Sequence, residues 1–220
     1  MSVEVLLKHS DFLIVNKPAG LAVHSGADTQ EAHLLDEFPG YHLINRLDKE
    51  TSGIVVLTAS AGLVARLTEA LQAPEAIKLY RALLRGGWKS ENLQISWDWP
   101  ISDKAEGRKN PQGLAQDRKA AKTQVSVMQF NQHLTEVECL LKSGRQHQIR
   151  KHAALAKHPV IGDPRYNDTQ YNLKLAQIYQ TQRMFLHAEK IEFFWKSQRI
   201  QAIAALDADF QKIISGLSQN

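Results

Sequence analysis

A succession of nine short runs rich in β-forming residues constrains the fold of this chain more than any other feature of its sequence. Several runs alternate apolar and polar residues with a period of two, as half-buried strands do. Many follow one another directly, and the last two read as a hairpin. The predicted strands cover residues 3–9, 11–18, 53–59, 76–86, 93–99, 123–130, 134–142, 184–195 and 198–205.

Helical periodicity is confined to three segments. Residues 60–72 begin with the capping residue Ser60 and carry their apolar side chains on one helical face. Residues 146–157 predict a second helix, entered through a Ser-Gly pair, and Asp207 is expected to cap a last helix. Strands therefore outnumber helices. The sequence predicts a single α+β domain over residues 1–220, with a largely antiparallel mixed sheet flanked by helices and loops.

The composition narrows the class of protein. A hydrophobic content of 43% in 220 residues is enough for a buried core. The apolar runs are too short to cross a bilayer, and the N-terminus lacks the pattern of a signal peptide, so we expect a cytoplasmic protein. The single cysteine, Cys139, excludes an internal disulfide and a thiolate-rich metal site, and we expect it to be buried in a strand.

The charge is more informative in its distribution than in its sum. An excess of 27 Lys and Arg over 23 Asp and Glu gives a net charge of +4, which by itself indicates nucleic-acid binding only weakly. Residues 142–157, however, carry five Lys or Arg and two His without any acidic residue, which predicts one basic face. His147 and His152 are five positions apart instead of four, with no carboxylate near them on that helix, so no metal site is predicted.

The stretch NRLDKETSGIVVLT contains the strongest candidate for a reacting group. Asp48 lies in a polar loop that enters an apolar strand, where a rigid sheet can present a side chain to a cleft. The alternative is that Asp48 and the Thr-Ser-Gly at residues 51–53 only form a hydrogen-bonded turn. The residues of this stretch leave both interpretations open.

Three other segments are candidates for a functional role. The stretch SGRQHQIRKH places Arg145 and Arg150 around the start of a helix, which suits phosphate binding, although an ordinary solvated basic helix has the same pattern. Tyr80 lies in a predicted strand, where a tyrosine serves either the core or a catalytic pocket. VNKPAGLAVHSG forms either a binding rim or a plain strand-turn-strand.

Six stretches in the order VNKPAGLAVHSG, NRLDKETSGIVVLTAS, KLYRALLRG, KAAKT, SGRQHQIRKHAALAKHPVIGD and FLHAEKIEF closely resemble the RluA-type family of RNA pseudouridine synthases. The resemblance spans residues 3–195. It implies the pseudouridine synthase fold with a central RNA-binding cleft. It also implies isomerisation of selected uridines in tRNA or rRNA, without a cofactor, metal or nucleotide.

The resemblance assigns roles to residues of this chain. It implies that Asp48 is the essential carboxylate, that Arg150 pairs with it, and that Tyr80 lines the pocket and assists proton transfer at C5. Arg46 is expected to fill the gap left by the flipped uridine, since flipping costs a few kcal/mol. An arginine within about 4–6 Å keeps a buried carboxylate ionised. RNA contacts, salt-dependent where they reach phosphates, are expected from Lys142, Arg145, His147, Gln148 and Lys151.

The chain departs from the pattern of the family at three places. Asn45 replaces the usual histidine, a change expected to act on loop packing or RNA contact and to leave the core chemistry intact. FFWKSQ replaces the usual His-Pro after the late LHA strand. There is no room before Val3 for the small S4-type domain of many relatives, so RNA selection is expected from the catalytic domain, as a monomer acting on a tRNA or rRNA stem-loop.

Two other functions compete with the isomerase. A non-catalytic protein that binds structured RNA would share the basic face, but the combined presence of Asp48, Tyr80 and Arg150 argues against it. A hydrolase of glycosidic bonds usually pairs two carboxylates. The nearest partner, Glu50, would point to the opposite side of an extended chain, so this function ranks last.

Overall fold

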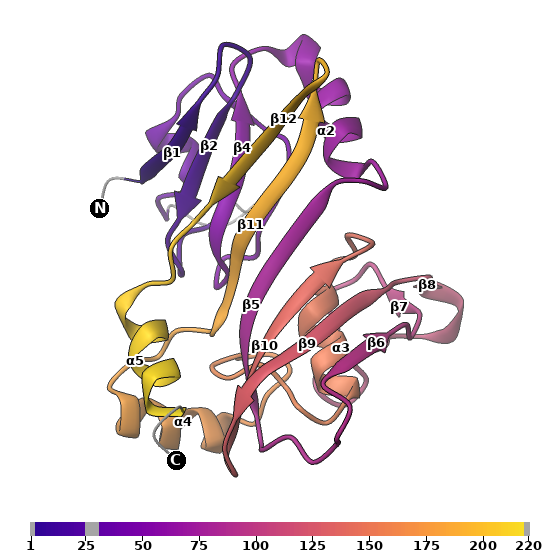
Figure 1. Cartoon of the computed structure of the whole chain (residues 1–220), viewed down its shortest axis with the longest axis vertical. Coiled ribbons are helices and arrows are strands. Elements are labelled where there is room, and N and C mark those ends of the chain that lie inside the picture. The colour runs from indigo at the N-terminus through magenta and orange to yellow at the C-terminus, as the bar shows by residue number, and fades with distance from the viewer. Residues whose placement is uncertain (1–2, 25–30, 218–220) are drawn as a thin grey trace. The chain divides into compact units, whose positions relative to one another are not determined.

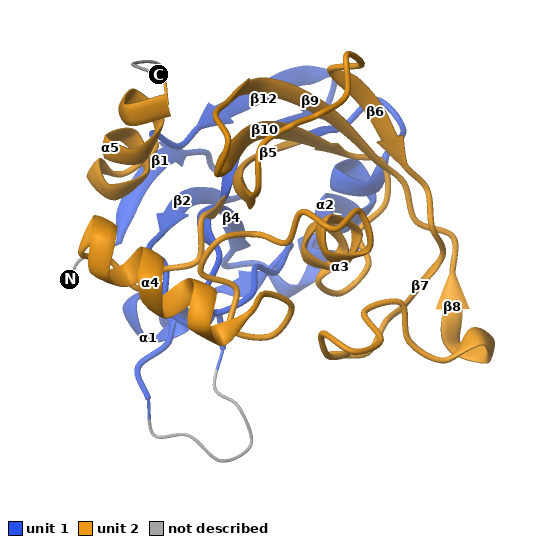
Figure 2. Ribbon diagram, turned by 90° about the horizontal axis from the view of Figure 1, so that it is seen from below, with its two compact units in different colours: residues 1–78, 187–205 blue, residues 79–186, 206–220 orange. Residues whose placement is uncertain are grey.

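Strands outnumber helices in the computed structural model of this protein, which describes residues 3–24 and 31–217 (Figure 1). The end of the VNKPAGLAVHSG stretch, Ser25 and Gly26, lies outside the described residues. The chain divides into two compact units, which Figure 2 shows in different colours. The first comprises Met1–Lys78 and His187–Ala205, and the second comprises Leu79–Leu186 and Leu206–Asn220. Each unit is described by itself.

The first unit is built on a sheet with the strand order β1-β2-β4-β11, in which β12 pairs with β11 and β3 with β4. β4 and β11 run parallel, and the other pairs are antiparallel. All seven residues of β4 are buried, as its apolar sequence predicts for a central strand. The strands are β1 (Glu4–Lys8), β2 (Leu13–Lys17), β3 (His42–Leu43), β4 (Ser52–Thr58), β11 (Leu186–Trp195) and β12 (Gln198–Ile203).

Turns and helices of this unit follow from local sequence. The predicted hairpin of β11 and β12 is confirmed, and its two loop residues, Lys196 and Ser197, both have positive φ, which matches the twist of the paired strands. The helix predicted after β4 is also confirmed as a 3-10 turn followed by α2 (Val64–Gln72). Ser60 precedes the turn but makes no capping hydrogen bond with its side chain. A short helix, α1 (Leu34–Glu37), was not predicted.

The second unit contains an antiparallel sheet in the order β5-β10-β9-β6. Its apolar side chains and those of helix α3 (Gln148–Leu155), which include Ile149 and Ala153, form one buried cluster. Cys139 lies in this cluster as predicted, and burial raises the pKa of its thiol. The sheet strands are β5 (Ile77–Arg85), β6 (Gln94–Trp97), β9 (Thr123–Phe130) and β10 (Leu134–Leu141), and β7 (Ile101–Ser102) and β8 (Arg118–Lys119) form a separate ribbon.

A second buried cluster of this unit joins Leu83 and Phe185 to Phe210 and Ile213 of the last helix, α5 (Ala208–Leu217). Asp207 caps this helix as predicted, since its carboxylate accepts a hydrogen bond from the Phe210 amide at 3.0 Å. Helix α4 (Thr169–Tyr179) was not predicted, although Asp168 caps it in the same way. Residues Leu175 and Tyr179 of α4 pack against this cluster.

The α+β class and the largely antiparallel mixed sheet are confirmed, with β4 and β11 as the parallel pair. All nine predicted strands are present, with ends that differ by a few residues. The central RNA-binding cleft and the organisation as a single domain stay predictions. Within the described part of the chain, no helix has the length and apolar character needed to cross a membrane.

Candidate active site

The loop that carries Asp48 is held by a buried lysine. Lys17, at the end of β2, is 0% exposed. Its Nζ donates hydrogen bonds to the carbonyls of Pro18 at 2.9 Å, Leu21 at 2.7 Å and Lys49 at 3.1 Å. A buried ammonium is tolerated only with such compensation. Lys17 therefore joins the turn that follows β2 to the residue directly after Asp48.

The chain then turns tightly from Asp48 into β4. The amide of Thr51 donates to the Asp48 carbonyl at 3.1 Å. Gly53 follows with φ of 109°, and a Cβ at this position would lie 2.3 Å from the carbonyl oxygen of Ala188 on β11. Only glycine combines this backbone conformation with so close an approach. Asp48 thus stands at the end of a loop that is anchored on both sides.

Ser52 and His187 connect the start of β4 to β11. Ser52 Oγ and His187 Nδ1 lie 2.8 Å apart, and His187 Nε2 lies 3.1 Å from the carbonyl oxygen of Ala204. Because a carbonyl only accepts, Nε2 carries a proton. In a neutral ring Nδ1 is then unprotonated and accepts a hydrogen bond from the Ser52 hydroxyl. Sequence reasoning assigned no role to Lys17 or His187, although both lie in stretches that carry the family resemblance.

Asn45, the departure from the family pattern, supports β4 directly. Its side-chain amide donates to the Ile54 carbonyl at 3.2 Å, and its Oδ1 accepts from the Val56 amide at 2.7 Å. The side chain thus bonds to β4 as the backbone of a neighbouring strand would. Of the two effects expected for this departure, the structure shows the one on loop packing. The next residue, Arg46, is exposed.

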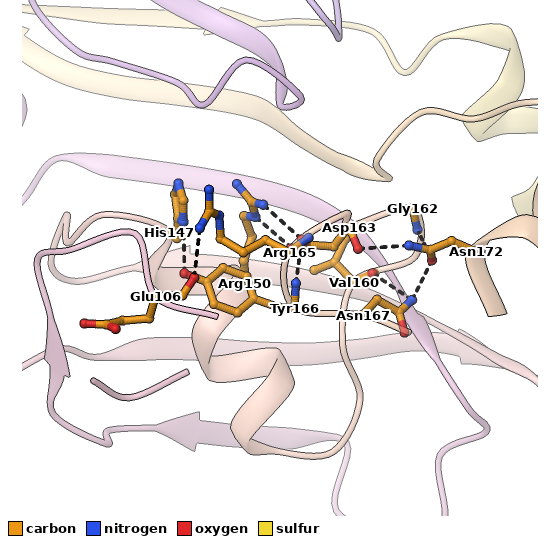
Figure 3. A network of polar contacts seen from close by, with 10 residues as sticks. All are labelled: Glu106, His147, Arg150, Val160, Gly162, Asp163, Arg165, Tyr166, Asn167 and Asn172. Carbon is orange, nitrogen blue, oxygen red and sulfur yellow. Dashed lines mark hydrogen bonds and ion pairs between the residues drawn. The ribbon is translucent and has the colours of Figure 1, made fainter. Parts of the chain in front are cut away.

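Arg150 on α3 forms a buried ion pair with Asp163 (Figure 3). Arg150 Nε lies 2.7 Å from Oδ2, and Nη2 lies 2.9 Å from Oδ1, so the pair is bidentate. The exposed fraction is 2% for Arg150 and 0% for Asp163. The guanidinium carbon also lies 5.3 Å from the centre of the Tyr166 ring.

The neighbours of this pair extend the polar network. The Tyr166 hydroxyl hydrogen-bonds His147 Nδ1 at 3.0 Å, and His147 has a left-handed backbone with φ of 55° at the start of α3. The Asp163 carbonyl accepts from the side-chain amide of Asn172 on α4 at 2.9 Å. Helices α3 and α4 are therefore connected through the segment that contains Asp163 and Tyr166.

Two residues predicted to contact RNA are buried. The side chain of Gln148 accepts from the Ser143 hydroxyl and the Arg145 amide, and it donates to the Lys122 carbonyl and the Thr123 hydroxyl. These four bonds use the hydrogen-bonding capacity of an amide in full. Gln148 thus holds the turn before α3 in place, and a direct contact with RNA would break bonds that maintain this turn.

Lys151 is 0% exposed, and its ammonium donates to the carbonyls of Ser102 and Lys104, both at 2.7 Å. His152 is buried as well, and burial lowers the pKa of its imidazole. Helix α3 therefore does not present the exposed basic face that its sequence predicts. Lys142 and Lys157 are exposed and Arg145 is half-exposed, so the positive charge of residues 142–157 that solvent reaches lies in the turns before and after the helix.

Tyr80 lies on β5 opposite Cys139 of β10 and packs against the cluster beneath α3. It belongs to the second unit with Arg150, whereas Asp48 belongs to the first. The predicted meeting of these three side chains stays a prediction. Among the residues that the structure describes, no group of three or more His, Cys, Asp and Glu is arranged to hold a metal ion.

Comparison with known proteins identifies the family to which this chain is similar. A family model described as RNA pseudouridylate synthase matches residues 11–155. Ribosomal large subunit pseudouridine synthase D of Xanthomonas campestris is 31% identical over 98% of this chain and 70% of its own. Ribosomal large subunit pseudouridine synthase C of Pasteurella multocida is 30% identical over 98% and 68%. tRNA pseudouridine synthase C of Vibrio cholerae is 28% identical over 96% and 94%.

Solved structures show the same fold. Human RNA pseudouridylate synthase domain containing 4 superposes with a TM-score of 0.79 and 21% identity, and covers 98% of this chain and 93% of its own. Human RNA pseudouridylate synthase domain containing 1 has a TM-score of 0.74 and 20% identity, with 100% and 96% covered. At this level of identity the likeness concerns the fold alone.

Proposed function

This chain belongs to the RNA pseudouridylate synthase family, and we propose that it isomerises selected uridines of tRNA or rRNA with Asp48 as the essential carboxylate. The observation that carries the assignment of Asp48 is the anchoring of the loop in which it lies. The loop is held by the buried Lys17 on one side and by the Gly53 contact on the other. A reacting group must be kept within a fraction of an ångström of its productive position, and a loop held on both sides supports the assignment of Asp48.

The reaction defines what the side chains must supply. Conversion of uridine to pseudouridine breaks the bond between N1 and C1′, forms one between C5 and C1′, and transfers the C5 hydrogen away as N1 gains one. Attack of a carboxylate at C1′, its attack at C6 and its removal of a ribose proton all require Asp48 in the ionised form. Because the rearrangement conserves the atoms and electrons of the nucleotide, the proposal includes no nucleotide cofactor.

Arg150 is proposed to keep Asp48 ionised. A carboxylate beside a stacked base loses hydration, which raises its pKa, and a guanidinium within about 4–6 Å opposes that shift. Asp163 binds Nε and Nη2 of Arg150, and the Nη1 edge is proposed to face Asp48. Tyr80 is proposed to receive or relay the C5 proton, either directly or through an ordered water.

RNA binding is proposed to use the exposed cations. Phosphate contacts are assigned to Lys142 and Arg145, which lie at the surface in the turn before α3. Arg46 is proposed to enter the space that the flipped base leaves, in a protein that acts as a monomer. The cytoplasm, where tRNA and rRNA are located, is the proposed site of action. His147, Gln148 and Lys151 then act on RNA through the turn and helix that they stabilise.

Asp48→Asn tests the catalytic role. We expect the unaltered protein to release tritium from C5-labelled total RNA of cells lacking the gene, and Asp48→Asn to reduce this release to background with RNA binding retained. Glu69→Gln, which removes an exposed charge of the same unit, serves as the matched control and should act as the unaltered protein does. Near-normal turnover by Asp48→Asn would overturn this mechanism.

The same assay separates the isomerase from a non-catalytic RNA-binding protein, which would retain RNA on a filter without releasing tritium. The relatives named above act on ribosomal RNA in two cases and on tRNA in one. Pseudouridine maps of both RNA classes, with and without the gene, would identify the substrate. A uridine of one class that loses its modification in the deletion strain, and regains it with the gene, is the expected result.

A further inference from the structure

We propose that Asp163 is a positioning residue of the isomerase, which together with the Tyr166 ring holds the guanidinium of Arg150 in one orientation. The inference rests on the proposed function, in which Arg150 serves Asp48. Asp163 belongs to the segment between α3 and α4, and no role in the reaction follows from its place in the sequence. Its contacts indicate one.

Four hydrogen bonds hold the carboxylate of Asp163. It accepts two hydrogen bonds from Arg150 and two from the backbone, with the amides of Arg165 at 2.8 Å and Tyr166 at 3.0 Å, both to Oδ1. These four donors fix the plane of the carboxylate and the direction in which its oxygens point (Figure 3). A guanidinium bound edge-on to that carboxylate must share its plane.

The backbone around Asp163 is equally fixed. Asn172 on α4 accepts a hydrogen bond from the Gly162 amide at 3.1 Å and donates one to the Asp163 carbonyl. Asn167 donates to the Val160 carbonyl at 3.2 Å. A Cβ on Gly162 would lie 2.0 Å from the carbonyl oxygen of Arg183, so glycine is required there. The backbone position of Asp163 is thus fixed through Gly162 and through its own carbonyl, both of which bind Asn172 on α4.

The Tyr166 ring limits the remaining motion of Arg150. The guanidinium carbon lies 5.3 Å from the ring centre, and the two bonds to Asp163 oppose rotation of the guanidinium about its long axis. The bonds of Asp163 use Nε and Nη2, which directs the Nη1 edge to one place. A buried cation aimed in this way interacts with an anionic group more strongly than a mobile one in water.

An ion pair that only stabilises the fold would have the same distances. A measurement of activity must therefore distinguish a positioning role of Asp163 from a purely structural one. Asp163→Asn preserves the size of the side chain but places an amide against Arg150, which disturbs its orientation. If Asp163 acts through Arg150, its loss should lower the chemical rate and leave RNA affinity unchanged. A loss of about 100-fold is the scale expected for a misplaced catalytic group.

The experiment measures single-turnover tritium release from C5-labelled total RNA of cells lacking the gene, with filter binding of the same RNA. Asp163→Asn should reduce the rate about 100-fold with affinity within a factor of about two. Glu136→Gln is the matched control, because Glu136 is another buried carboxylate that binds an arginine, Arg81, at 2.7 Å. It should retain the unaltered rate.

Three further variants separate the positioning role from a loss of folding. Asp163→Glu retains the charge but displaces the carboxylate by one methylene, and we expect its rate to fall as well, whereas a full rate would overturn the positioning role. Arg150→Ala alone should equal Arg150→Ala with Asp163→Asn within about twofold. Multiplicative losses in this double variant would also overturn it.

The outcomes also separate this inference from the function on which it rests. Equal rates for Asp163→Asn and Glu136→Gln, with an active unaltered protein, would overturn the inference alone. An unaltered protein that releases no tritium from any RNA class would overturn the proposed function and the inference with it.

Discussion

The ammonium of Lys17 donates a hydrogen bond to the carbonyl of Lys49 at 3.1 Å, although 32 positions separate the two residues in the chain. This bond places the residue after Asp48 against the end of β2. The same ammonium also binds the carbonyls of Pro18 and Leu21. The loop proposed to carry the reacting carboxylate is therefore organised by a charge that solvent does not reach.

Lys17→Met is expected to lower both stability and activity, because it removes the donor for three carbonyls. Unpaired buried polar groups cost roughly 1–3 kcal/mol each, and partial relaxation leaves an expected loss of about 3 kcal/mol in the free energy of unfolding. Urea denaturation measures it. Lys8→Met, at the exposed end of β1, should stay within about 0.5 kcal/mol. Equal stability of the two variants would contradict the role of Lys17.

Asn45→Ala is expected to destabilise the protein by about 1–2 kcal/mol, since each of its two bonds to β4 contributes about 1 kcal/mol. Thermal or urea unfolding measures the change. Asn16→Ala, which loses one exposed bond to Glu4, is the control and should change stability by at most about 0.5 kcal/mol. If Asn45→Ala has no effect on stability but weakens RNA binding, the residue acts on RNA instead.

Salt dependence distinguishes surface cations from buried ones. Lys142→Ala and Arg145→Ala should each weaken RNA binding and reduce the slope of log K against log salt by about 1, the value for one lost phosphate contact. Lys151→Met should lower stability and leave the slope unchanged, because its ammonium binds backbone carbonyls. A folded Lys151→Met protein with a reduced slope would show that Lys151 reaches phosphate.

The pH dependence of stability should contain a contribution from His152. Burial lowers the pKa of His152 in the folded state, so the unfolded chain binds the proton first as pH falls. The free energy of unfolding is therefore expected to decrease as pH drops below about 6.5, the unperturbed value for histidine. His152→Gln should reduce this decrease in urea titrations between pH 7.5 and 5. An unchanged pH dependence in the variant would contradict this prediction.

The strands of this protein could be predicted from the sequence because period-two alternation and buried apolar runs are local properties. Residues 123–130 are predicted and observed as the strand β9 with the same bounds. Helix α4 was not predicted because it lacks such a local pattern. None of its side chains is fully buried, so its sequence has no clear apolar face to recognise.

For the candidate site as well, local patterns could be predicted from the sequence, whereas contacts between distant residues could not. The sequence by itself determined the α+β class, the family and the identity of the side chains proposed to react, because those depend on local patterns and on motifs along the chain. Only the tertiary structure decided that Arg150 binds Asp163, that Lys151 and Gln148 are buried, and that Lys17 holds the Asp48 loop. A charged residue carries no local sign of whether water or a distant partner will solvate it, and that choice is made only when the chain has folded.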